Sequence, residues 1–132
     1  MEVHLNYTAV VIAAIANYSI GAIWYGALFG KEWQKLTGIT EMKPTPGNVI
    51  GGLLSALVMS YVLAHAIVFA EAYLKVGGIA GGLMGGFFNW LGFIATVTLG
   101  SVLYEKKPWK LWLINNGYWL VSLLVMGAIL SK

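Results

Sequence analysis

Four long runs of the chain contain no charged residue. They cover residues 3–30, 44–70, 76–104 and 111–131 of the 132-residue sequence. An α-helix needs about 20 apolar residues to cross the hydrocarbon core of a bilayer, which is about 30 Å thick. Each run is long enough to cross that core once. The sequence therefore predicts an all-α, four-transmembrane-helix bundle, an integral membrane protein that contacts the lipid bilayer.

The composition agrees with a membrane protein. Hydrophobic residues make up 59% of the chain and charged residues 10%, and the mean hydropathy is +0.78. A soluble domain could not cover this much apolar surface with so few charges. We expect one transmembrane domain over residues 1–132, with spans at about 5–29, 48–70, 78–103 and 110–130.

The lysines are unevenly divided between the two predicted sides of the bundle. With four spans, loops 1 and 3 share one side, and loop 2 and both termini share the other. The positive-inside rule places the side with more lysines in the cytoplasm, so we expect a multi-pass protein of the inner membrane with both termini outside. The first side carries Lys31, Lys35, Lys43, Lys106, Lys107 and Lys110, and the second carries Lys75 and Lys132.

Aromatic side chains gather at the same predicted inner boundary, at Trp24, Tyr25, Trp33 and Trp109. Amphipathic rings favour the headgroup level of a bilayer, so we interpret these four residues as an interface belt. The chain contains no Arg, and its lysines are scattered at the predicted helix ends. This pattern does not resemble a basic stripe that follows phosphates, and we expect no nucleic-acid partner.

Glycines recur at helical spacing in the third span. Small residues let helix backbones approach closely in lipid, where no hydrophobic force drives helices together, so the pattern predicts a tight helix contact. The spacing leaves open whether the contact lies within one chain or between chains. The predicted packing residues are Gly77, Gly78, Gly81, Gly82, Gly85 and Gly86.

Asparagines occur at depth in three predicted spans, at Asn17, Asn89 and Asn115. Side-chain amides in the hydrocarbon core must find partners, because water is absent there. One interpretation is hydrogen bonding between helices, worth roughly 0.5–2 kcal/mol for each pair. The other is a polar lining along the path of an ion or small solute.

His65 is the one ionisable residue well inside a predicted span. Such a residue is a candidate functional group because keeping it in the membrane costs free energy. Tyr61 lies four residues earlier on the same helix face and could bond to it. His65 could form a proton- or metal-sensitive cluster with His4, Glu2 and Glu71, or it could be a neutral histidine bonded to a carbonyl or to Tyr61. The ligand spacing is not diagnostic of a metal, so we predict none.

Catalytic machinery is sparse in the sequence. There is no Asp, no Arg and no Cys, and every Glu lies in a predicted loop or near a terminus. A Ser-His-carboxylate triad would need a distant Glu to reach His65. We therefore expect no enzymatic activity, no catalytic residue and no cofactor.

Several segments resemble one family. Residues 23–33, Ile-Trp-Tyr-Gly-Ala-Leu-Phe-Gly-Lys-Glu-Trp, are similar to the signature of a bacterial family known as domain of unknown function 1761. The resemblance continues through residues 61–65, 90–93, 114–118 and 126–130, and so extends over nearly the whole chain. It implies a short bacterial membrane protein with four helices, and it brings no activity or substrate.

Two functional hypotheses follow from these observations. The first is a passive channel or a carrier of an ion or small solute, with the three asparagines along the path and His65 near its outer mouth. The second is a structural or interaction protein without transport activity. In both cases we expect a homo-oligomer that associates through glycine-rich or aromatic faces.

Overall fold

The uncharged runs fold into four long helical rods. The computed structural model describes residues 4–39 and 44–131. The rods long and apolar enough to cross a membrane are Tyr7–Leu28, Pro46–Leu74, Gly78–Leu103 and Trp109–Leu130, which confirms the predicted all-α membrane fold. The elements are α1 (Tyr7–Ile23), the π-helical η1 (Trp24–Leu28), α2 (Gly30–Thr37), α3 (Pro46–Leu74), α4 (Gly78–Asn89), the π-helical η2 (Trp90–Ala95), α5 (Thr96–Leu103) and α6 (Trp109–Leu130).

The ends of the rods follow from local chemistry. The Asn6 side chain caps α1 by accepting from the backbone N–H of Ala9 at 3.1 Å. Thr45 caps α3 in the same way, and Pro46 occupies the first turn, where its missing N–H is not needed. The first turn of α4 begins at Gly78, whose φ of +70° is a conformation that glycine adopts without strain.

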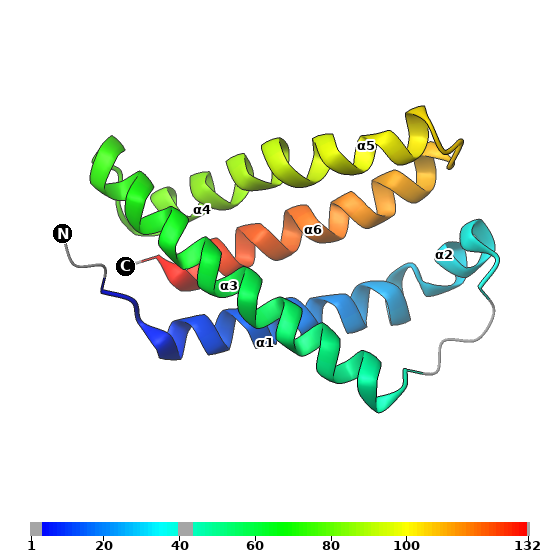
Figure 1. The fold of residues 1–132 in the computed structure, drawn as a ribbon, viewed down its shortest axis with the longest axis horizontal. Coiled ribbons are helices and arrows are strands. Elements are labelled where there is room, and N and C mark those ends of the chain that lie inside the picture. The colour runs from blue at the N-terminus through cyan, green and yellow to red at the C-terminus, as the bar shows by residue number, and fades with distance from the viewer. Residues whose placement is uncertain (1–3, 40–43, 132) are drawn as a thin grey trace.

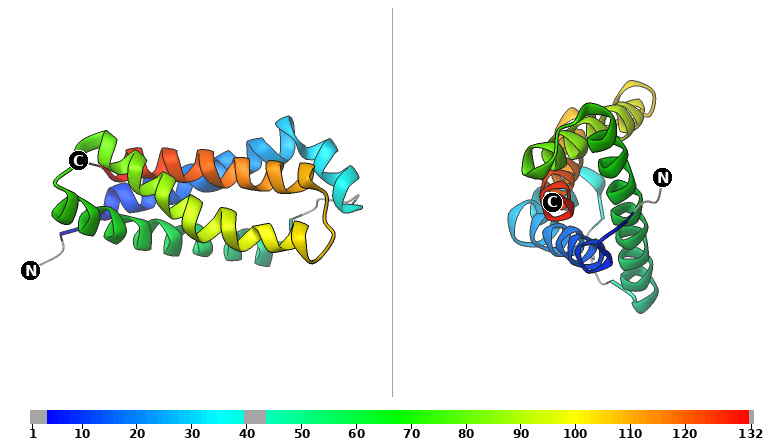
Figure 2. Two further views of the ribbon diagram at one scale, coloured as in Figure 1. Left: turned by 90° about the horizontal axis from the view of Figure 1, so that it is seen from above. Right: turned by 90° about the vertical axis from the view of Figure 1, so that its left-hand side faces the viewer.

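α6 lies at the centre of the bundle. In Figures 1 and 2, the first span lies on one side of α6 and the third span, α4–η2–α5, lies on the other. α3 crosses obliquely over one face of these rods. Its first half contacts α1 and its second half contacts α4, as the contacts of Gly52 with Tyr18 and of Gly85 with Ile67 show.

The two ends of the bundle carry different segments. α2 and the turn between α5 and α6 lie at one end, and the start of α1, the end of α6 and the turn between α3 and α4 lie at the other (Figure 1). The grouping of the loops matches the four-span prediction. The assignment of one end to the cytoplasm stays a prediction from the lysine count, in which Lys43 and Lys132 fall outside the described residues.

The glycines of α4 bring its backbone into close contact with the backbone of α6. A Cβ added at Gly82 would collide with the carbonyl oxygen of Gly127 on α6, and one added at Gly86 would collide with that of Leu123. Gly85 faces α3 instead, where a Cβ would lie 3.0 Å from Ile67 Cγ1. The spacing left open whether the glycine contact lies within one chain or between chains. In the structure, the contact lies within one chain.

The other predicted glycines differ in their surroundings. Gly81 is buried near the start of α4. Gly77 is exposed, and nothing lies within 4 Å of where its Cβ would be. Gly77 and Gly78 precede the stretch where α4 meets α6. They form the turn that starts α4.

Replacing Gly82 by Leu should destabilise the bundle, because the new side chain would push α4 away from the backbone of α6. We expect the free energy of unfolding to fall by about 1–3 kcal/mol, seen as a lower thermal midpoint by circular dichroism in detergent. Gly51→Leu is the matched control, since nothing lies within 4 Å of a Cβ at Gly51. Equal midpoints for the two variants would contradict the proposed backbone contact.

Candidate functional site

Two adjacent asparagines on α6 form hydrogen bonds with the two spans that flank this helix. The Tyr25 hydroxyl, in the first span, donates to Asn115 Oδ1 at 2.7 Å. The Thr98 hydroxyl, in the third span, lies 3.0 Å from Asn116 Oδ1. Successive residues of a helix point about 100° apart, so a pair of neighbouring amides can serve both flanking rods.

Two tryptophans hold the flanking spans to the backbone of α6. Trp24 Nε1–H donates to the carbonyl of Ile114 at 2.9 Å, and Trp90 Nε1–H donates to the carbonyl of Asn116 at 3.0 Å. Each tryptophan begins a π-helical segment, η1 or η2, and a glycine follows two residues later in both. π-Helical turns inside α-helices are rare and are frequent at functional sites.

Asn17 lies near the middle of the first span and is buried in a polar cluster. Its Nδ2 donates to Ser122 Oγ on α6. The Tyr118 hydroxyl donates to the backbone carbonyl of Asn17 at 3.1 Å. Asn17, Tyr118 and Ser122 are all buried, so this cluster joins α1 to α6 at mid-depth.

A cavity of about 990 Å³ extends from this cluster toward the end of the bundle that carries α2 and the turn between α5 and α6. We call this end the lysine-rich end, and we call the cavity the cleft. Its lining residues come from the first span, α2, the first half of α3 and α6. Lys31 is the one charged side chain among the described lining residues. The lining residues with an amide or hydroxyl group are Asn17, Tyr18, Tyr25, Gln34, Asn48, Ser55, Asn115 and Tyr118.

The cleft does not continue past Asn17. Toward the termini, the space between α1, α3 and α6 is filled by a buried apolar cluster. Met126 and Ala13 are fully buried there, so the cluster excludes water. The cluster consists of Ala13, Leu63, Ile67, Leu123 and Met126. Among the described residues, this apolar cluster therefore interrupts a polar route from the cleft toward the termini.

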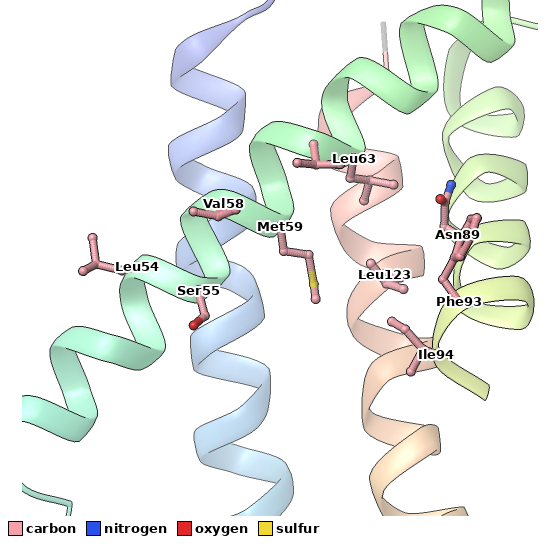
Figure 3. Close-up of a pocket in the computed structure, with 10 residues that line it drawn as sticks. Leu54, Ser55, Val58, Met59, Leu63, Asn89, Phe93, Ile94 and Leu123 are labelled. Carbon is pink, nitrogen blue, oxygen red and sulfur yellow. The ribbon is translucent and has the colours of Figure 1, made fainter. Parts of the chain in front are cut away.

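A second hollow, of about 730 Å³, lies between α3 and the η2 region of the third span. We call it the groove (Figure 3). Its lining is mostly aliphatic and aromatic, and Asn89 is one of its few polar residues. The Asn89 amide donates to the carbonyl of Gly85 in its own helix at 2.8 Å. Asn89 thus lies apart from Asn17 and Asn115, which line the cleft.

His65 and Tyr61 line neither the cleft nor the groove. Tyr61 is exposed on α3 and His65 is half-buried. His65 Nδ1 lies 2.9 Å from the carbonyl oxygen of Tyr61, one turn earlier, and the two rings are in contact with centroids 4.5 Å apart. The structure therefore places His65 on an outward aromatic face, away from the asparagines it was expected to join.

The predicted outer cluster is only partly within the described chain, because Glu2 lies outside it. Among residues 4–39 and 44–131, no group of three or more His, Asp and Glu side chains is arranged to hold a metal ion. Glu71 lies at the end of α3, and its Oε1 is buried with no hydrogen-bond partner.

The four predicted interface aromatics divide into two kinds. Trp24 and Tyr25 point inward and bond to α6, as described above, so neither polar group is available to a lipid headgroup. Trp33 packs edge-on against Tyr25 with centroids 5.8 Å apart. Trp109 is 56% exposed at the end of α6, as expected for an interface residue.

An exposed ion pair links α2 to the start of α6 beside the cleft. Glu32 on α2 accepts from Lys110 Nζ, at the start of α6, at 2.7 Å. The hydrogen bond from Lys110 and its positive charge lower the pKa of the Glu32 carboxyl below its ordinary value. The pair therefore stabilises the folded state at neutral pH, and its contribution is lost as the pH falls through the lowered pKa. α2 carries Lys31 and Gln34, so the pair helps to position this wall of the cleft.

Several residues of the cleft and of the cluster around Asn17 were not among the predicted site residues. Gln34 lies in predicted loop 1 and Asn48 at the predicted start of the second span, where polar residues are expected for solubility alone. Tyr118 and Ser122 are one turn apart on α6 and bond to Asn17 from the same face. The available signal was the shared spacing of Asn115, Tyr118 and Ser122, which falls on one helix face.

Comparison with known families identifies the chain. Residues 8–131 match the model of the family described as "Protein of unknown function (DUF1761)". The chain belongs to this family, in agreement with the resemblance of its motifs. Neither the curated proteins nor the solved structures yield a match.

A double-mutant cycle on Tyr25 and Asn115 measures the bond that joins the first span to α6. We expect Tyr25→Phe and Asn115→Ala to show a coupling energy of about 1 kcal/mol in detergent unfolding, as for other hydrogen bonds between membrane helices. Tyr7→Phe is the control partner for Asn115→Ala, because Tyr7 is 65% exposed. A coupling of zero for Tyr25 would show that the bond contributes nothing to stability.

Proposed function

We propose that this membrane protein is a carrier that binds the polar part of its substrate in the cleft. The observation that supports this is the extent of the cleft, which reaches from the lysine-rich end to Asn17 near the middle of the first span. Transport folds commonly bind their substrate near the bilayer midplane. A volume of about 990 Å³ falls within the range of about 300–1,000 Å³ that is usual for ligand pockets.

A carrier fits this geometry better than a passive channel within one chain. A channel needs a polar route through the whole membrane, and here the apolar cluster around Met126 and Leu123 fills the route beyond Asn17. A carrier exposes its site to one side of the membrane at a time. In one of its states, the part of the route beyond the site is therefore expected to be closed. Crossing would then require the apolar cluster to part while the cleft closes. No catalytic step is part of this proposal.

The alternative is a structural protein, and one observation favours it. The Asn17 and Asn115 side chains already have partners within the bundle. Polar groups that are paired inside the bundle can have a purely structural role, which is to hold helices together. In that case a homo-oligomer would use the aromatic face of α3 around Tyr61, His65 and Phe69, because the glycines of α4 are occupied within the chain.

Flux in proteoliposomes tests the carrier proposal with a matched pair of variants. Gly26 lines the cleft, and nothing lies within 4 Å of a Cβ at this position, so Gly26→Leu narrows the cleft without a clash. Gly92 is the equivalent glycine of η2, and nothing lies within 4 Å of a Cβ at this position either. Gly92 lines neither the cleft nor the groove. We expect wild type and Gly92→Leu to move a probe above the protein-free rate, and Gly26→Leu to lose most of that movement.

The probes are glycerol, urea, chloride and inorganic phosphate, together with fluorescent phospholipids that report transfer between leaflets. Circular dichroism of each variant checks that it is folded. If no probe moves faster than in protein-free vesicles, the carrier proposal is wrong and the structural role is favoured. If Gly26→Leu and Gly92→Leu carry a probe equally well, the cleft is not the route.

A further inference from the structure

The cleft and the groove share part of their wall. Ser55 and Met59, one turn apart on α3, line both hollows. Figure 3 shows the Met59 side chain extending from α3 toward the region between α1 and α6, with Leu123 on α6 nearby. Ser55 is small and exposed, and Met59 is a flexible side chain. The two hollows therefore meet at a boundary that consists of a hydroxyl and a movable thioether.

The two hollows differ sharply in chemistry. The groove is lined by aliphatic and aromatic side chains such as Val58 and Phe93, and Asn89 has bonded its amide to its own helix. The cleft is the more polar of the two, because amides and hydroxyls at mid-depth lie among its apolar and aromatic lining residues. A molecule that fits both hollows at once has a polar end and an apolar end, joined at the level of Met59.

The polar end is best matched by an anion. Lys31 lines the cleft, and no acidic side chain does so among the described lining residues. Asn115 Oδ1 accepts from Tyr25, which leaves the Nδ2 hydrogens as the free donors of that amide. Donors and one ammonium group favour phosphate oxygens over a cationic headgroup. Lysines near a membrane surface also attract anionic lipids, by about 1 kcal/mol each.

We propose that the substrate of the carrier is an anionic phospholipid. Its phosphate headgroup enters the cleft from the lysine-rich end, and its acyl chains remain in the groove and the adjoining bilayer. The headgroup can then move along the amides and hydroxyls of the cleft while the chains stay in an apolar medium. The boundary at Ser55 and Met59 is where the lipid passes between the two hollows. This inference rests on the proposed carrier function and names its substrate class.

Transfer of fluorescent phosphatidylglycerol and phosphatidylcholine between leaflets tests this proposal. The protein is reconstituted in phosphatidylcholine vesicles, and a reductant quenches the probe in the outer leaflet. We expect wild type to move phosphatidylglycerol several-fold faster than phosphatidylcholine. Lys31→Gln should reduce this preference by about fivefold, the equivalent of about 1 kcal/mol.

Substitutions at the shared boundary locate the route. Met59→Trp places a bulky ring between the cleft and the groove, and it should bring phosphatidylglycerol transfer close to the protein-free rate. Leu57→Trp is the control, because Leu57 is 40% exposed on the same helix and lines neither hollow. If Met59→Trp fails to fold, Ser55→Trp gives the same test at an exposed position.

The outcomes separate this inference from the carrier function. One outcome is that water-soluble probes move, that Gly26→Leu stops them and that no lipid moves. The carrier function is then supported and the lipid substrate is wrong. The lipid substrate is also wrong if inorganic phosphate is carried in place of the lipid, or if both lipids move equally fast. If no probe of either kind moves, both proposals are wrong.

Discussion

The fold depends on the pairing of polar groups in a medium without water. An amide or indole N–H in the hydrocarbon core has to bond within the protein, because lipid offers no partner. α6 supplies most of these partners among the described residues. Its asparagines, Asn115 and Asn116, face opposite spans, and its backbone carbonyls accept from Trp24 and Trp90. A central helix with polar contacts on both sides fixes the positions of its neighbours.

The two sides of α6 are packed differently, and the difference creates the cleft. Toward α4, glycines bring backbone against backbone, so no space remains. Toward the first span, large side chains such as Tyr25 and Tyr118 hold the helices apart while they bond across the gap. α3 crosses over both sides at an angle and cannot fill the space beneath its first half (Figure 1). Tight packing by small residues and wide packing by aromatics therefore coexist around one helix.

The spans could be predicted from the sequence because uncharged length is a strong constraint. The predicted spans end within a few residues of the observed rods, and the largest difference is at the end of α3, which continues to Leu74. The direction of single side chains could not be predicted. Trp24 fits an interface belt by its position, but the π-helical turn at η1 and the flat surface of Gly117 let its ring lie against α6. His65 was predicted near a pathway because of its depth, but the helical phase of α3 turns it outward.

Thiol accessibility tests most directly whether the cleft opens at one end and is closed beyond Asn17. The chain has no cysteine, so single cysteines can be introduced without background. Asn115→Cys lies in the cleft, and Ala13→Cys lies in the apolar cluster beyond it. In membranes, a water-soluble reagent that cannot cross the bilayer should label Asn115→Cys from one side only and leave Ala13→Cys unlabelled. Equal labelling of Asn115→Cys from both sides, or none from either, would contradict a cleft that opens at one end.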